Sequence, residues 1–149
     1  PHSMQLFVLN ADPTVGADVH FLNTGVPHAV AFLDKLEGLD ISRLGAYLRY
    51  HEAFSPKGTN ANFARILSPG HIAIRTYERG VEDETLACGT GMTACALLHA
   101  VLTDAPSPIQ VDVAGGDTLK VGFQRTGDRF TDVTLTGPAD LVFTGDIQI

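Results

Sequence analysis

Residues 84–101 read ETLACGTGMTACALLHAV, and this stretch decides the expected fold. A turn of small residues is followed by a run of helix formers, which predicts a helix over residues 89–102. From Met92 onward the run carries no charged residue and is apolar on nearly every side. A helix that is apolar all round is buried in a core rather than lying on a surface. The stretch therefore predicts a central, buried helix.

Short apolar segments bounded by turn residues lie on both sides of this helix and indicate strands. They cover residues 6–9, 19–22, 28–33, 62–67, 71–78, 109–113, 118–124, 130–137 and 141–149. A second helix is expected over residues 39–54, with Asp40 or Ser42 as its N-cap. The pattern predicts one α+β domain, a mostly antiparallel sheet curled like a barrel around the central apolar helix.

Composition restricts the class of protein. The chain has 149 residues, 44% hydrophobic and 18% charged, which fits one soluble domain. Its net charge of −7 argues against nucleic acid or an anionic membrane as a partner. No apolar run approaches the roughly 20 residues needed to span a bilayer. Residues 1–4 (PHSM) resemble a tag remnant, so the domain is expected over residues 5–149.

The chain has two cysteines, Cys88 and Cys95. Two turns of helix would separate them by about 10 Å, which is too far for a disulfide. They also lack the paired spacing of a zinc site, so no metal site is expected. Free thiols of this kind are typical of the reducing cytoplasm.

The position of Cys88 at the mouth of the helix has chemical consequences. A helix start leaves backbone N–H groups unpaired and favours the thiolate form of a nearby cysteine. Because Gly89 has no side chain, the N–H groups of Gly89 and Thr90 could receive a carboxylate. A thiolate base beside a bound carboxylate suits removal of an α-proton. Local context alone leaves Cys88 equally open to being a small packing residue, whereas Cys95 is expected to be one.

Other polar residues are ambiguous when they are taken singly. His28 follows a proline at the start of an expected strand, where a histidine is usually structural. Glu78 and Arg79 precede a glycine and fit an exposed charge pair. Asn60 and Asn62 follow a glycine and fit turn residues.

Taken together, several stretches resemble the diaminopimelate epimerase family. The run TYERGVEDETLACGTGMTACA, residues 76–96, is similar to that family's second cysteine signature, in which E-R-G precedes A-C-G-[ST]-G. Four further stretches occur in the family's order along the chain: GVPHAV, FSPKGTNANF, GGDTLKVGF and VTLTGPADLVFTGDI. The resemblance covers nearly the whole chain.

The resemblance implies an isomerase that needs neither pyridoxal phosphate nor any other cofactor. It interconverts LL- and meso-diaminopimelate, on the route to lysine and peptidoglycan, using two cysteines on opposite faces of the α-carbon. The family fold is two pseudo-symmetric halves, each a sheet around a helix.

Residue roles follow from the same resemblance. Cys88 is expected to be one catalytic acid or base, supported by Glu78. His28 is expected to serve the other cysteine across the cleft. The α-carboxylate would bind at the helix start, and the substrate contacts expected from the resemblance are Asn60, Glu78, Arg79, Gly89 and Thr90, with Arg79 suited to the distal carboxylate.

This sequence departs from the family pattern in three places. Val26 stands where the family has an asparagine before the Pro-His pair, and Phe143 stands where it often has an aromatic hydroxyl at a dimer contact. The segment with the other cysteine is absent from the 149 residues. The chain is therefore expected to correspond to the C-terminal half, to lack epimerase activity alone, and to need an N-terminal domain as partner. An exposed cleft face would also permit self-association into a homo-oligomer.

Three other functions stay open. The first is a related cofactor-independent racemase acting on another amino acid. The second is a non-catalytic module that kept the carboxylate site. The third is a cysteine hydrolase, for which His28 would have to lie close to Cys88 as its general base.

Overall fold

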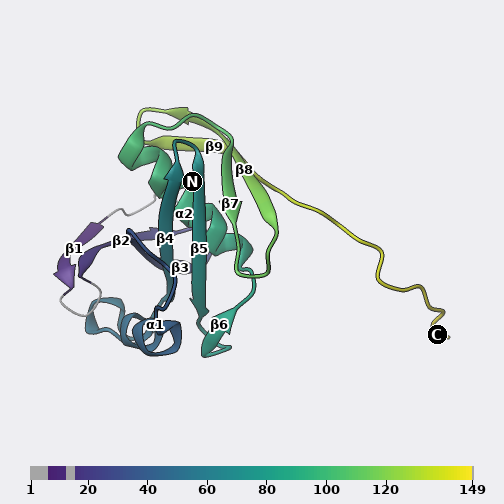
Figure 1. The fold of residues 1–149 in the computed structure, drawn as a ribbon, viewed down its shortest axis with the longest axis horizontal. Coiled ribbons are helices and arrows are strands. Elements are labelled where there is room, and N and C mark those ends of the chain that lie inside the picture. The colour runs from purple at the N-terminus through teal and green to yellow at the C-terminus, as the bar shows by residue number, and fades with distance from the viewer. Residues whose placement is uncertain (1–6, 13–15, 149) are drawn as a thin grey trace.

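The structure is a computed structural model that describes residues 7–12 and 16–148, and it shows one curled sheet with two α-helices (Figure 1). The strands are β1 (Phe7–Asp12), β2 (Ala17–Asn23), β3 (Pro27–Phe32), β4 (Asn60–Ser68), β5 (His71–Glu78), β6 (Asp83–Thr85), β7 (Ile109–Asp112), β8 (Thr118–Thr126) and β9 (Arg129–Thr136). The helices are α1 (Ile41–Arg49) and α2 (Gly89–Thr103), with a short 3-10 helix at Glu52–Phe54. The expected tag remnant lies outside the described residues.

The sheet is mixed, and its strand order explains where the helices lie. The order is β1-β2-β3-β4-β5-β7-β8-β9, with β6 also paired to β5. Neighbouring strands are antiparallel except for β3 with β4 and β5 with β7, and these two parallel pairs are connected through α1 and α2. The connections from β3 to β4 and from β5 to β7 lead the same way along the sheet, and such connections are right-handed. Because β3 and β5 run in opposite directions, this handedness places α1 and α2 on opposite faces of the sheet.

Helix α2 forms the centre of the larger core. It contacts β2, β3, β4, β5, β7, β8 and β9, and the sheet curls around it (Figure 1). Its buried residues are Gly91, Met92, Ala94, Cys95, Ala96, Leu97, Leu98, His99 and Ala100. All of these except Gly91 and His99 share one apolar cluster with side chains such as Val30, Ile72 and Val121 from the surrounding strands. The prediction of a mostly antiparallel sheet around a central apolar helix is therefore confirmed.

Helix α1 covers the opposite face and is shorter than expected. Asp40 is its N-cap, and one carboxylate oxygen accepts a hydrogen bond from the N–H of Arg43 at 3.0 Å. The helix ends at Arg49, whereas the sequence predicted a helix as far as residue 54. His51 has a φ of −59° and a ψ of 140°, which is not helical, and its Nδ1 accepts from the N–H of Ala53 at 3.2 Å. This side-chain cap starts a separate 3-10 turn, which explains the break.

Gly45 allows α1 to lie directly on the sheet. A Cβ at this position would collide with the Cβ and ring of Tyr77 on β5. A glycine that weakens the helix locally therefore brings the helix axis close to the sheet, and Tyr77 fills the space. The second apolar cluster, which includes Leu44, Leu48 and Phe63, is built around this contact.

Residues 137–148 form no helix or strand, so the expectation of a last strand at 141–149 is wrong for this chain. Figure 1 shows this segment leaving the sheet after β9 and running away from the domain. Leu141, Val142, Phe143 and Ile147 are each more than 80% exposed. A strand needs a neighbour to receive its backbone hydrogen bonds, and the described residues offer this segment none.

None of the helices in the described ranges is both long enough and apolar enough to cross a membrane.

Candidate functional site

Polar side chains from three adjacent strands meet on the α2 face at one end of the sheet. In the parallel pair, His28 on β3 lies opposite Asn60 on β4. In the antiparallel pair, Asn62 on β4 lies opposite Thr76 on β5. Directly paired residues point to the same face, and so do alternate residues of one strand. The register therefore gathers His28, Asn60, Asn62 and Thr76, all with less than 5% of their surface exposed.

The start of α2 faces this cluster. Cys88 is the N-cap residue, with extended backbone geometry and only 9% of its surface exposed. Its carbonyl accepts the first helical hydrogen bond, from the N–H of Met92 at 2.8 Å. Within the described ranges, the N–H groups of Gly89 and Thr90 donate to no protein acceptor. Two unpaired donors at a helix start can bind an anion beside the Cys88 sulfur.

Thr90 links the helix start to the strands. Its Oγ1 lies 2.9 Å from Nε2 of His28 and 3.6 Å from Sγ of Cys88. Its backbone carbonyl accepts a hydrogen bond from Oγ1 of Thr24 at 3.0 Å. Three residues singled out from the sequence, Cys88, Thr90 and His28, are thus brought together in one hydrogen-bonded group. The expected role of His28 toward a second cysteine stays a prediction.

Asn62 is part of this group, although the sequence suggested only a turn residue. Its Nδ2 lies 3.0 Å from Nδ1 of His28 and donates to the carbonyl of Ala29 at 3.1 Å. Its Oδ1 accepts from Oγ1 of Thr76 at 3.0 Å. Alternation could have revealed it, because positions 60 and 62 of one strand share a face. Thr76 carried no signal in the sequence, since its role depends on the β4–β5 register.

Burial shifts the pKa of two groups, the His28 imidazole and the Cys95 thiol. His28 has no exposed surface, and its pKa is lowered to about 4. Burial is the larger cause, and the positive charge of Arg79 is the smaller one. Its imidazole is therefore neutral at pH 7. Burial raises the pKa of the Cys95 thiol, which also has no exposed surface. Cys95 is a packing residue, as expected, and both cysteines are free thiols.

Asn60 joins the turn after β5 to the start of β3. Its Oδ1 accepts the N–H of Arg79 at 2.7 Å, and its Nδ2 donates to the carbonyl of Pro27 at 3.2 Å. Nη1 of Arg79 donates to the carbonyls of Lys57 and Gly58 at 3.3 and 3.4 Å. The expected substrate contacts of Asn60 and Arg79 stay predictions, and both residues lie beside the group around His28.

Glu78 ends β5 on the same face as Thr76. Its carbonyl accepts from the N–H groups of Val81 and Glu82 at 3.2 and 2.8 Å, which closes the turn. Among the described residues, its carboxylate has no hydrogen bond or ion pair, with Cys88 or with any other group. Its expected support of Cys88 stays a prediction.

Glu82 holds the turn that carries Glu78 and Arg79. One carboxylate oxygen accepts from the N–H of Gly80 at 3.0 Å and from Nε of Arg49 at 3.1 Å. The other oxygen accepts from the hydroxyl of Tyr50 at 3.1 Å. These hydrogen bonds lower the pKa of Glu82 below its ordinary value, and the one from Gly80 has the largest effect. The backbone of Glu82 has a φ of 61°, so its side chain holds an uncommon conformation in place.

Replacing Glu82 with glutamine is expected to lower the free energy of unfolding by about 1–2 kcal/mol at pH 7, because hydrogen bonds to a charged group are lost. A carboxyl whose pKa is lowered on folding stabilises the protein above its unfolded pKa, near 4.5. That stabilisation is lost as the pH falls through the lower pKa of the folded state. Urea unfolding of both proteins should therefore show a difference that shrinks below about pH 4.5. Glu52→Gln, an exposed carboxylate, is the control, and a difference that grows on acidification would contradict the assignment.

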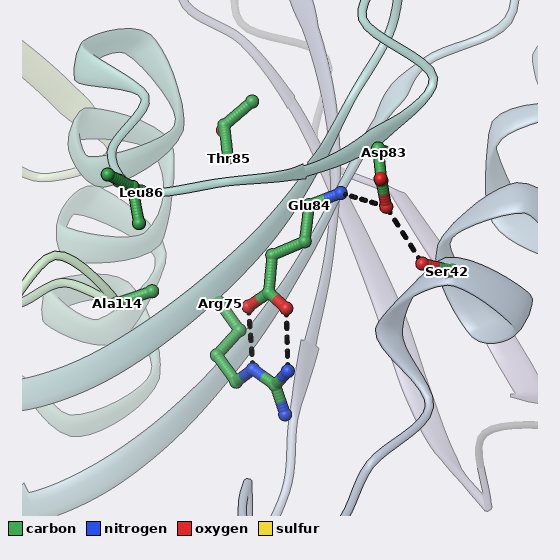
Figure 2. A pocket seen from close by; sticks show the side chains of 7 residues that line it. All are labelled: Ser42, Arg75, Asp83, Glu84, Thr85, Leu86 and Ala114. Atoms are coloured by element: carbon green, nitrogen blue, oxygen red, sulfur yellow. Dashed lines mark hydrogen bonds and ion pairs between the residues drawn. The ribbon is translucent and has the colours of Figure 1, made fainter.

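A hollow beside β6 contains none of the expected site residues (Figure 2). Nε and Nη2 of Arg75 donate to the two carboxylate oxygens of Glu84 at 2.7 and 2.6 Å. Nη1 of Arg75 donates to the carbonyls of Leu36 and Leu39 at 3.1 and 3.2 Å. Asp83 accepts from the N–H of Glu84 and from the hydroxyl of Ser42, both at 2.8 Å. The charged groups of the hollow are engaged with each other, so we assign it a structural role.

Fold and site together define a class of protein: an α+β domain whose buried central helix begins with a cysteine and free N–H groups beside a buried histidine. Among the described residues, no group of His, Cys, Asp or Glu side chains could hold a metal ion. The chain belongs to the diaminopimelate epimerase family, whose family model matches residues 20–142.

Curated relatives support this assignment. The diaminopimelate epimerase of Chlorobaculum tepidum is 45% identical over 131 residues, covering 87% of this chain and 50% of its own. That of Flavobacterium psychrophilum is 47% identical over 124 residues, covering 83% of this chain and 48% of its own. The chain thus spans about half the length of these curated relatives. A solved structure of a probable proline racemase from Agrobacterium radiobacter is 14% identical, covers 89% of this chain and 41% of its own, and has a TM-score of 0.49.

Proposed function

We propose that this chain is the Cys88-bearing half of an epimerase that interconverts LL- and meso-diaminopimelate. The observation that carries the proposal is the start of α2, where the Cys88 thiol adjoins the unpaired N–H groups of Gly89 and Thr90. We propose diaminopimelate as the substrate because the relatives are named diaminopimelate epimerases. Two free thiols also fit a reducing, cytoplasmic location.

In the proposed reaction, the α-carboxylate of the substrate accepts hydrogen bonds from the N–H groups of Gly89 and Thr90. The Cys88 thiolate removes the α-proton, and the electron pair of the C–H bond moves into the carboxylate. The same donors and the dipole of α2 stabilise the charge that develops there. An acid on the opposite face returns a proton to the α-carbon, so the configuration inverts without net oxidation or reduction.

The second acid must come from outside the 149 residues. Cys95 is the other cysteine of the chain, but it is fully buried seven residues along the same helix. It cannot reach the opposite face of a substrate held at Cys88. We therefore propose an incomplete catalytic set in this chain, completed by a separate domain, and no conversion of LL- to meso-diaminopimelate by the chain alone.

The surrounding residues are proposed to bind and assist. The carboxylate of Glu78, which has no hydrogen bond or ion pair among the described residues, is proposed to exchange a proton with Cys88. Arg79 uses Nη1 on backbone carbonyls and keeps its other guanidinium donors for a distal carboxylate. Asn60 is proposed to contact the substrate through its remaining amide hydrogen, and His28 to act on Cys88 through the Thr90 hydroxyl.

A titration followed by amide NMR tests this proposal. We expect LL-diaminopimelate to shift the signals of Gly89, Thr90 and Arg79 in the 15N-labelled chain. L-lysine, which lacks the distal carboxylate, should bind more weakly, and Arg79→Gln should remove that difference. Unchanged signals at Gly89 and Thr90 would refute the carboxylate site. Tighter binding of proline would favour a related racemase, and binding without any α-hydrogen exchange would favour a non-catalytic module.

A further inference from the structure

The hydrogen bonds around His28 form a chain whose direction can be read from the chemistry of each group. The chain runs from Thr76 through Asn62, His28 and Thr90 to Cys88. The orientation of the Asn62 amide determines which group donates at each link.

The Ala29 carbonyl fixes that orientation. A carbonyl oxygen only accepts, so the group of Asn62 that lies 3.1 Å from it must be the NH2. The same Nδ2 lies 3.0 Å from Nδ1 of His28. Nδ1 must therefore be the acceptor and carry no hydrogen. Oδ1 of Asn62 is left to accept from the hydroxyl of Thr76, at 3.0 Å.

The tautomer of His28 follows from this. A neutral imidazole without a hydrogen on Nδ1 carries it on Nε2. Nε2 then donates to Oγ1 of Thr90, 2.9 Å away. The Thr90 hydroxyl keeps its own hydrogen, and among the described residues Sγ of Cys88, at 3.6 Å, is an acceptor within its reach. A hydroxyl that donates to the sulfur gives the nucleophilic thiolate a hydrogen-bond partner.

Gly91 makes room for this arrangement. A Cβ at this position would lie 2.5 Å from Oδ1 of Asn62 and 3.4 Å from both Sγ of Cys88 and Cε1 of His28. The hydrogen-bond chain thus occupies the space that a side chain on the first turn of α2 would fill. Its inner members, His28, Asn62 and Thr76, are 0%, 0% and 2% exposed, so water does not compete for their hydrogen bonds.

We propose that Asn62, oriented by the Ala29 carbonyl and the Thr76 hydroxyl, is a positioning residue that holds His28 as the Nε2–H tautomer and so turns the Thr90 hydroxyl toward Cys88. Its benefit to catalysis rests on the proposed function, but the hydrogen-bond directions do not. Neither Asn62 nor Thr76 touches the substrate in this proposal.

The chain offers an internal reference for the test. Nε2 of His99 accepts from the N–H of Gly70 at 3.2 Å, so its hydrogen lies on Nδ1. His28 and His99 are both fully buried, and burial lowers the pKa of each. At pH 7 the two imidazoles are neutral, and we expect them to be opposite tautomers.

Long-range 1H–15N NMR of the ligand-free chain at pH 7 tests the tautomers directly. We expect His28 as Nε2–H and His99 as Nδ1–H. Asn62→Asp, whose ionised carboxylate can only accept, should move the hydrogen of His28 to Nδ1, turn the Thr90 hydroxyl toward Nε2, and slow the alkylation of Cys88 by iodoacetamide by about threefold or more. Gln110→Glu, which adds the same charge at an exposed site on β7, should change neither readout.

Each outcome decides the proposal. His28 as Nδ1–H in the unaltered chain would overturn it, as would Asn62→Asp with an unchanged tautomer and an unchanged alkylation rate. If Asn62→Asp does not fold, the unaltered chain still decides the tautomer. Thr76→Val then provides the rate test, with slower alkylation supporting the proposal and an unchanged rate overturning it. If His28 and His99 show the expected tautomers but the protein does not bind diaminopimelate, the proposed function is refuted and the positioning role of Asn62 stands.

Discussion

Replacing Cys88 with alanine is expected to reduce the exchange of the diaminopimelate α-hydrogen for solvent deuterium by about 10²- to 10⁴-fold, the usual contribution of a general base. A single base can remove and return a proton on one face, so the 149-residue chain should exchange slowly without inverting the centre. Mass spectrometry in D2O measures the exchange, and chiral chromatography checks that the configuration is retained.

Cys95→Ala is the matched control, because it removes a thiol from the same helix. Cys95 has no exposed surface and its pKa is raised by burial, so its loss should leave the exchange rate unchanged. Iodoacetamide labelling should likewise disappear in Cys88→Ala and persist in Cys95→Ala. Equal exchange in the unaltered chain and in Cys88→Ala would show that Cys88 is not the base.

Replacing Leu98 with alanine is expected to lower the free energy of unfolding by about 2–5 kcal/mol, because it opens a cavity in a close-packed core. Leu98 is 1% exposed and lies in the apolar cluster around α2. Urea unfolding measures the change.

Leu102→Ala on the same helix is the control for helix propensity. Leu102 is 47% exposed, so its truncation should change the free energy of unfolding by no more than about 0.5 kcal/mol. Equal losses in the two variants would contradict the view that burial of α2 is what stabilises the domain.

The fold was predictable wherever local pattern and burial agreed. The apolar run after Gly91 could only be a buried helix, and the alternating segments on either side paired as strands. Two expectations were wrong where a local signal depended on its surroundings. The helix expected as far as residue 54 ends at Arg49, since the side chain of His51 caps a separate turn. The segment 141–149 has strand-like composition but finds no neighbour to pair with among the described residues.

The residues at the helix start could be predicted from the sequence, whereas the polar residues that hydrogen-bond behind them could not. Cys88, Gly89 and Thr90 are contiguous, so the chemistry of a helix start could be inferred from their order alone. His28 needed the parallel β3–β4 register to reach Thr90, more than sixty residues away in sequence. Asn62 could be inferred only from its alternation with Asn60 on one strand. Thr76 needed a second register, between β4 and β5, and no local pattern distinguishes it from an ordinary strand residue.

The sequence by itself determined the buried helix and the cysteine at its start, because these depend on residues close together in the chain. Only the tertiary structure decided which polar groups are linked to that cysteine by hydrogen bonds. The direction of their hydrogen bonds is set by one acceptor, the Ala29 carbonyl, whose position depends on the pairing of β3 with β4. A hydrogen bond has a donor and an acceptor fixed in space, and that arrangement exists only once the sheet has curled around α2.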